Sequence, residues 1–266
     1  MKKYLGILLL SLCFLLSSCS LINPKDFKIN MPTIDKHSFE SEIIDICKDL
    51  SDSYTANSNI WYNFNIESYT GPVEGASNSY EVTHKEIKIV GSIRLGPTFF
   101  DTLLHYIYTE KDYGDPGQTI EKEVFWVEGV SYTKTTINQL ENKEVTRERG
   151  YDYNAAFGAN SYFSYVKGTY SPKLIYNNIF ATLENELANI TAYKDGNRYG
   201  YTAKYTKNTQ NYYEQCSFKY DPETHLFKNF DLFIKDSYRN DESLLRIEID
   251  QALFGVIIKP MDSDRY

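Results

Sequence analysis

Residue types that usually carry catalysis are present in the chain, but not at the spacings that catalysis needs. The chain has four histidines, His37, His84, His105 and His225. They are far apart, and none has a second histidine or a cysteine at the spacing of a zinc site. The pairs Glu121 with Glu123 and Asp262 with Asp264 could supply an acid and a base, but acidic residues are frequent here and favour a solvated face.

Glycine-rich and nucleophile motifs are also missing from the sequence. It contains no Gly-x-x-x-x-Gly-Lys phosphate loop, no Gly-x-Gly-x-x-Gly and no Gly-x-Ser-x-Gly. We therefore expect a protein that is not an enzyme and that uses no cofactor or metal. The alternative is an extracytoplasmic hydrolase whose catalytic residues come together only in the fold.

An aromatic segment between Gly150 and Tyr170 is the strongest candidate for ligand binding. Its aromatic residues include Tyr151, Tyr153, Phe157, Tyr162, Phe163 and Tyr165. Aromatic rings with hydroxyl tips suit sugars, lipid head groups or a protein partner. The interpretation that we favour over binding is that the segment covers an open end of a sheet, which tyrosines do at little cost in conformational entropy.

The first nineteen residues predict a secretory signal. Lys2 and Lys3 are followed by an apolar run from Tyr4 to Leu16, which is shorter than the ~20 residues of a membrane-spanning helix. The stretch Leu16-Ser17-Ser18-Cys19 then resembles the lipobox of bacterial lipoproteins. The resemblance implies that Cys19 receives a diacylglycerol and becomes the first residue of the mature chain, held on a membrane by two acyl chains. An ordinary secretory signal with a chance cysteine is the alternative.

Two further cysteines, Cys47 and Cys216, would remain in the mature chain. Outside the cytoplasm they could form a disulfide, because two cysteines allow a single pairing. Both also lie on apolar faces of their predicted elements, where a free cysteine acts as a small apolar side chain.

The composition predicts a folded, acidic and strand-rich body. Hydrophobic residues make up 42% of the chain, with 24 tyrosines and 15 phenylalanines, which is more than a disordered chain carries and favours strands. The formal net charge is −8, so we expect no nucleic-acid partner.

The apolar pattern predicts two helices and a series of strands. Between Ser38 and Tyr54, apolar residues recur every three or four positions, as in an amphipathic helix. A second helix is expected to begin at Ser171-Pro172 and to end near Asn189. The expected strands are 60–67, 80–95, 101–111, 120–128, 130–136, 190–194, 198–207, 212–220, 225–236, 244–250 and 253–259. Short turns such as Glu128-Gly129 and Asp195-Gly196 separate many of them, which predicts an antiparallel meander.

This order of elements is similar to that of the half-barrel proteins typified by the periplasmic lipoprotein carrier LolA and its lipid-anchored relatives. The similarity covers about residues 38–260 and includes the turn from Tyr220 to Leu226 and the ending Ile257-Ile258-Lys259-Pro260. It implies an α+β, mostly β fold in which a large curved antiparallel sheet packs against one N-terminal and one mid-chain helix and leaves an apolar cavity. It implies no particular binding residue, because no position-specific motif matches.

We expect three regions: a lipoprotein signal peptide over residues 1–18, a lipid-anchored tether over 19–36 and a single β-rich domain over 37–266. The expected function is that of a lipoprotein of the bacterial cell envelope, anchored on the extracytoplasmic face of a membrane, that binds a hydrophobic or amphiphilic ligand such as a lipid or a lipoprotein. The alternative is a structural or adhesive envelope protein that binds a protein or glycan through an aromatic surface.

Overall fold

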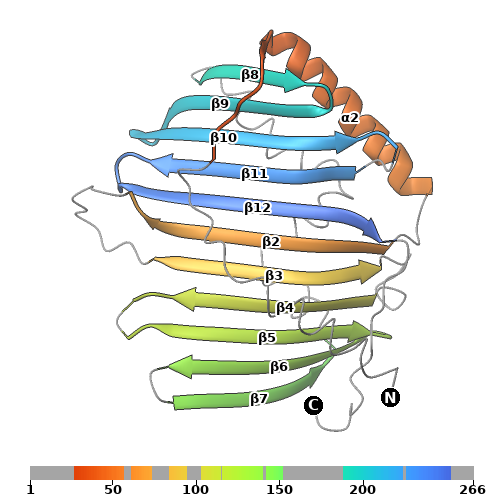
Figure 1. Ribbon diagram of the computed structural model, residues 1–266, viewed down its shortest axis with the longest axis vertical. Helices are drawn as coiled ribbons and strands as arrows, with labels where there is room; N and C mark the ends of the chain where they lie inside the picture. Colours follow the sequence, from red (N-terminus) through yellow and green to blue (C-terminus); the bar gives the residue numbers. More distant parts are fainter. Residues whose placement is uncertain are drawn as a thin grey trace.

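The computed structural model describes residues 27–56, 61–73, 84–94, 103–114, 116–139, 142–151, 188–223 and 226–252. Within these ranges the chain forms one helix and twelve strands, and all the strands belong to one antiparallel sheet (Figure 1). The helix is α2 (Lys36–Ala56). The strands are β1 (Thr33–Ile34), β2 (Trp61–Pro72), β3 (Lys85–Arg94), β4 (Leu103–Asp112), β5 (Gln118–Val127), β6 (Val130–Gln139), β7 (Asn142–Gly150), β8 (Asn189–Asp195), β9 (Arg198–Lys207), β10 (Gln210–Asp221), β11 (Leu226–Asp236) and β12 (Asp241–Ala252).

The sheet consists of two meanders joined side by side. Its strand order is β1-β8-β9-β10-β11-β12-β2-β3-β4-β5-β6-β7, so β12 joins the meander β8–β12 to the meander β2–β7. The joint is long, since β12 pairs with β2 from Asp241 opposite Pro72 to Ala252 opposite Trp61. The predicted mostly β, antiparallel fold with an N-terminal helix is therefore confirmed.

Helix α2 begins at a side-chain cap. The Asp35 carboxylate accepts the backbone N–H of Ser38 at 3.0 Å, and the Asp35 carbonyl accepts the N–H of Phe39 at 3.0 Å, which satisfies donors that a helix leaves unpaired. The hydrogen bond from the Ser38 N–H lowers the pKa of Asp35. The cap explains why the helix begins two residues before the predicted start at Ser38.

One side of the sheet, which we call the helix face, packs against α2. The apolar stripe of the helix is buried at Phe39, Ile43 and Ile46, as predicted. The Phe39 ring centroid lies 6.3 Å from that of Tyr199 and 6.5 Å from that of Tyr201. In Figure 1, α2 accordingly runs along the part of the sheet that contains β8 to β11.

The other side, which we call the opposite face, carries the segment from Phe27 to Asp35. Phe27 is buried in a small cluster with Phe233 and Leu244, and β1 then pairs with β8 at the sheet edge. The described part of the predicted tether therefore packs on the sheet and adds a strand to it. We did not predict β1, because two residues are too few to show an alternating pattern.

Strand β7 was also missed by the sequence analysis. Every residue from Asn142 to Arg149 is exposed, so the strand lacks the apolar alternation by which strands are recognised. Its charged side chains suit its position at the free edge of the sheet, where they discourage pairing with another chain.

The predicted hairpin turn at Glu128-Gly129 is confirmed, with φ angles of 53° and 77°, the left-handed pair that a two-residue hairpin turn requires. The mid-chain helix predicted over 171–189 and the strand predicted over 253–259 lie outside the described residues, apart from the last two positions of that helix. Among the helical residues that are described, no segment is both long enough and apolar enough to cross a membrane.

Candidate functional site

Most of the predicted site residues lie outside the described part of the chain. This holds for Cys19 and for five of the six aromatic candidates, Tyr153, Phe157, Tyr162, Phe163 and Tyr165. Tyr151 is described: it follows β7 directly, is 73% exposed and has the Arg149 guanidinium 5.9 Å from its ring centroid. The binding role of these residues stays a prediction.

Of the two cysteines considered for a disulfide, Cys216 is a free, buried cysteine on the helix face. It shares that face with Tyr212, Phe218 and Tyr220, as the alternation along β10 predicted. Burial raises the pKa of its thiol well above the ordinary value, so the thiol is a poor nucleophile. Cys47 lies on α2, and its side chain is outside the described set. Since Cys216 is free, the disulfide considered between the two is not formed in this structure.

The helix face carries a continuous apolar band that extends well beyond α2. The band begins at Ala192 and Tyr201 beneath the helix and continues over β12, β2, β3, β4 and β5. The buried side chains on these five strands are Ile247, Ile249, Phe64, Ile66, Ile89, Ile93, Leu104, Tyr106, Tyr108, Val124 and Trp126. The ring contacts and polar contacts that the described residues of α2 make include those with β8, β9 and β10.

Gly91 makes room for the aromatic rings in this band. A Cβ atom at Gly91 would lie 2.3 Å from the His105 carbonyl oxygen and 2.8 Å from Cζ of Phe64. The Tyr106 Cβ would be 2.7 Å away. The absence of a side chain at Gly91 therefore lets Phe64 and Tyr106 pack across it.

A buried carboxyl group lies on the helix face, near the hairpin between β9 and β10. Glu214 is 4% exposed and accepts hydrogen bonds from the hydroxyls of Tyr201 and, at 3.0 Å, Tyr205. Burying a carboxyl group is costly unless its oxygens are paired in this way. Burial and the adjacent Glu214 charge also raise the pKa of Tyr205, so Tyr205 remains a neutral donor.

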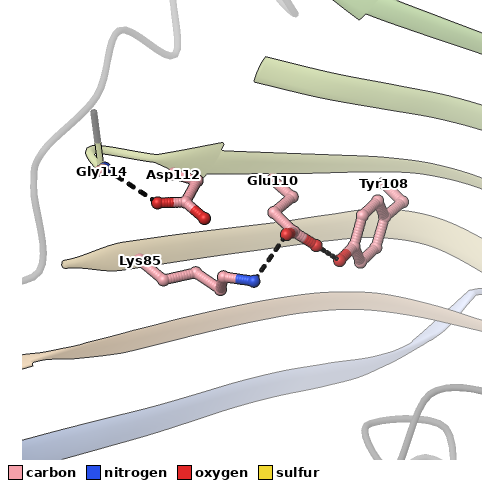
Figure 2. A network of polar contacts seen from close by, with 5 residues as sticks. All are labelled: Lys85, Tyr108, Glu110, Asp112 and Gly114. Atoms are coloured by element: carbon pink, nitrogen blue, oxygen red, sulfur yellow. Dashed lines mark hydrogen bonds and ion pairs between the residues drawn. The ribbon is translucent and has the colours of Figure 1, made fainter. Parts of the chain in front are cut away.

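A second polar network lies on the helix face of β3 and β4 (Figure 2). Glu110 accepts a hydrogen bond from the Tyr108 hydroxyl and pairs with the Lys85 ammonium at 2.7 Å. The ammonium of Lys122 lies 5.9 Å from the Tyr108 ring centroid. Burial alone would raise the pKa of Glu110, but the hydrogen bonds from Lys85 and Tyr108 outweigh it and hold that pKa below its usual value.

The two networks lie toward the same end of the sheet. The cross-strand register runs from Glu214 to Ile234, then to Ser243, Thr70 and Lys85. Glu214 and Lys85 therefore share one row across five strands, roughly 19 Å apart at ordinary strand spacing. On this side, the apolar band thus ends near a row that contains Glu214 and Lys85, and tyrosine hydroxyls bond the carboxyl groups of Glu214 and of Glu110, the partner of Lys85.

Neither network was predicted from the sequence, although the sequence contains a signal for one of them. Glu214 has the same parity along β10 as Tyr212 and Cys216. The alternation along the strand therefore predicts that its carboxyl group lies on the packed face. The partners Lys85 and Glu110 are 25 residues apart, and only the strand register brings them together.

The carboxyl groups of Glu110 and Glu214 are hydrogen-bonded by tyrosine hydroxyls, and no cluster of three or more potential metal ligands occurs among the described residues. On the opposite face, His105 lies 3.3 Å from Glu123 and stacks on Phe125 with ring centroids 4.1 Å apart.

No protein-family model matches this chain, and no curated protein matches it. Among solved structures, it is similar to the crystal structure of a DUF1329 family protein from Desulfovibrio piger, at 10% sequence identity and a TM-score of 0.20. That match covers 81% of this chain and 94% of that chain.

Proposed function

We propose that this protein is a non-enzymatic lipoprotein of the bacterial cell envelope that binds an apolar or amphiphilic ligand, such as a lipid or a lipoprotein acyl chain, on the helix face. Cys19 carries the lipid anchor on the extracytoplasmic side of a membrane. The sheet curves as a half-barrel, and the ligand lies along the apolar band.

The observation that carries the proposal is the extent of the band relative to α2. The described contacts of the helix include those with β8, β9 and β10, and the buried apolar side chains continue from there as far as Trp126 on β5. The band is wider than the described contacts of α2, and its side chains are already covered within the chain. We therefore place the ligand between the band and what covers it, where apolar contact gives an acyl chain its affinity. The phenols and charges at its end suit the polar head of an amphiphile.

Trp126 provides a direct test, because it is fully buried in the band and the chain has only one other tryptophan, Trp61. In a Trp61→Phe variant, a fatty acid brominated along its chain should quench most of the Trp126 fluorescence, since bromine quenches only at close contact. The Trp126→Phe variant, which keeps Trp61, is the matched control. Absence of quenching at saturating brominated fatty acid would contradict binding on the helix face.

The anchor is tested separately with Cys19→Ser in cells. The unchanged protein should incorporate a labelled fatty acid and sediment with membranes, and the variant should lose the label. Equal labelling of both proteins would disprove lipidation at Cys19 and would leave the Trp126 test unaffected.

A further inference from the structure

The opposite face holds a groove of about 470 Å³ between the N-terminal segment and strands β8, β9 and β10. Its lining includes Lys28, Tyr193, Thr202, Lys204, Tyr213 and Gln215. The groove lies on the other side of the sheet from the apolar band, so it is independent of the ligand proposed there.

The wall of the groove that carries Lys28 is fixed on both sides. Before Lys28, the buried Phe27 packs in its cluster with Phe233 and Leu244. After Lys28, the Pro32 carbonyl accepts the N–H of Lys194 at 3.0 Å. Gly200 permits the close approach, since a Cβ there would lie 2.9 Å from Cε of Met31. Lys28 is therefore held at the groove rather than on a free tail.

The groove is lined by cationic and neutral hydrogen-bonding groups, and none of its lining residues is acidic. Lys28 and Lys204 have no carboxylate within ion-pair distance among the described residues. Beside them, the hydroxyl oxygens of Tyr193 and Thr202 are 3.5 Å apart, and the Gln215 amide donates to the Tyr213 hydroxyl. Such a site stands out in a chain with a net charge of −8.

We propose that this groove binds a small phosphate-bearing ligand with hydroxyl groups, of the glycerol phosphate class. Lysine ammoniums bind phosphate as point charges, and the neighbouring hydroxyls and amides suit the hydroxyls of the ligand. The volume is that of a small-molecule site. Free glycerol phosphates and the headgroups of anionic lipids share this chemistry.

A lipid headgroup is within reach if Cys19 is anchored as proposed. The chain from Cys19 to Lys28 spans at most roughly 32 Å when fully extended. The groove would then lie within roughly 32 Å of the bilayer surface, where lipid phosphates are concentrated. This membrane source depends on the proposed anchor, whereas binding of a free glycerol phosphate does not.

The test compares two double variants that remove the same charge. Lys28→Gln with Lys204→Gln empties the groove of its ammoniums, and Lys207→Gln with Lys219→Gln removes two exposed lysines elsewhere on β9 and β10. Calorimetric titration with glycerol 3-phosphate at low salt measures the free ligand, and flotation with phosphatidylglycerol or phosphatidylcholine vesicles measures the headgroup. Circular dichroism verifies that both variants are folded.

We expect the groove variant to bind about tenfold more weakly or worse, as for loss of charged hydrogen bonds, and the control variant to bind as the unchanged protein does. Binding in the calorimeter points to a soluble ligand, and binding to phosphatidylglycerol vesicles alone points to a headgroup. The proposal is overturned if the unchanged protein binds neither probe, or if both double variants weaken binding equally, because a general charge effect would then suffice.

Discussion

The two faces of this sheet are built from the same strands but from different chemistry. On β4, the helix face carries Leu104, Tyr106 and Tyr108, all buried, whereas the opposite face carries Ile107, which is 41% exposed. On the helix face, tyrosine hydroxyls bond the carboxyl groups of Glu214 and Glu110, and Glu110 also pairs with Lys85. On the opposite face, the contacts of carboxyl groups include ion pairs such as Lys88 with Glu67, at 3.2 Å.

Alternation along each strand therefore gives the sheet two chemically different faces. The helix face holds most of the buried apolar side chains, and the opposite face holds the polar groove beneath the N-terminal segment. The loss of stability caused by a substitution should therefore depend more on the face that carries the residue than on the residue type.

The largest expected difference between the faces is at β4. Leu104→Ala should lower the free energy of unfolding by about 2–5 kcal/mol, because it removes buried methyl groups and leaves a cavity. Ile107→Ala on the same strand should cost less than about 1 kcal/mol, because its side chain is already partly in water. Urea unfolding followed by circular dichroism measures both, and equal losses would show that the two faces do not differ in packing.

The next largest loss of stability is expected when glycine is replaced by alanine. Gly91→Ala on the helix face should destabilise the protein by roughly 1–3 kcal/mol, since its Cβ would overlap the His105 carbonyl and the Tyr106 Cβ. Gly196→Ala should lower the free energy of unfolding by about 1 kcal/mol, because the φ of +57° is unfavourable for alanine. No steric cost is added, since a Cβ at this position would meet nothing within 4 Å. Thermal unfolding of the two variants checks the order, and a more stable Gly91→Ala protein would contradict the tight packing of the band.

Removing the buried carboxyl group should have an effect of similar or smaller size. Glu214→Ala leaves the Tyr201 and Tyr205 hydroxyls without their acceptor and should cost about 1–3 kcal/mol. Glu121→Ala, on the opposite face and exposed, should change stability by no more than about 0.5 kcal/mol. Urea unfolding in the same buffer compares them, and a neutral Glu214→Ala would show that the phenols find other partners.

The smallest effect is the response to alkaline pH. Burial, the hydrogen bond to Glu42 and the Glu42 charge raise the pKa of Tyr199 to about 12, from 10.0. The folded state therefore holds this proton longer than the unfolded state does. The resulting stability is complete below pH 10 and is lost between pH 10 and about 12. Absorbance at alkaline pH should show a late-titrating tyrosine that disappears in Tyr199→Phe; an unchanged titration curve would contradict the assignment.

Much of the fold could be predicted from the sequence, because local patterns determine it. The stripe Phe39, Ile43 and Ile46 predicted the buried side of α2, and the left-handed pair Glu128 and Gly129 predicted a tight turn. Strand β7 could not be predicted in this way, because an exposed edge strand needs no apolar alternation.

The arrangement of the sites could not be predicted, because it depends on pairing between distant strands. The joint between β12 and β2 unites residues some 180 positions apart, and it places Glu214 in one row with Lys85. The groove requires the segment around Lys28 to cross β9 at Gly200. A glycine in a strand can signal such close approach, but it does not reveal which segment approaches.

Native mass spectrometry of the protein purified without detergent tests the central claim, that the helix face binds an apolar or amphiphilic ligand, most directly. We predict mass additions corresponding to one or more lipids on the folded protein, which are lost when the protein is denatured. A folded protein that shows only its own mass, and that takes up no added phospholipid or fatty acid, would contradict the account.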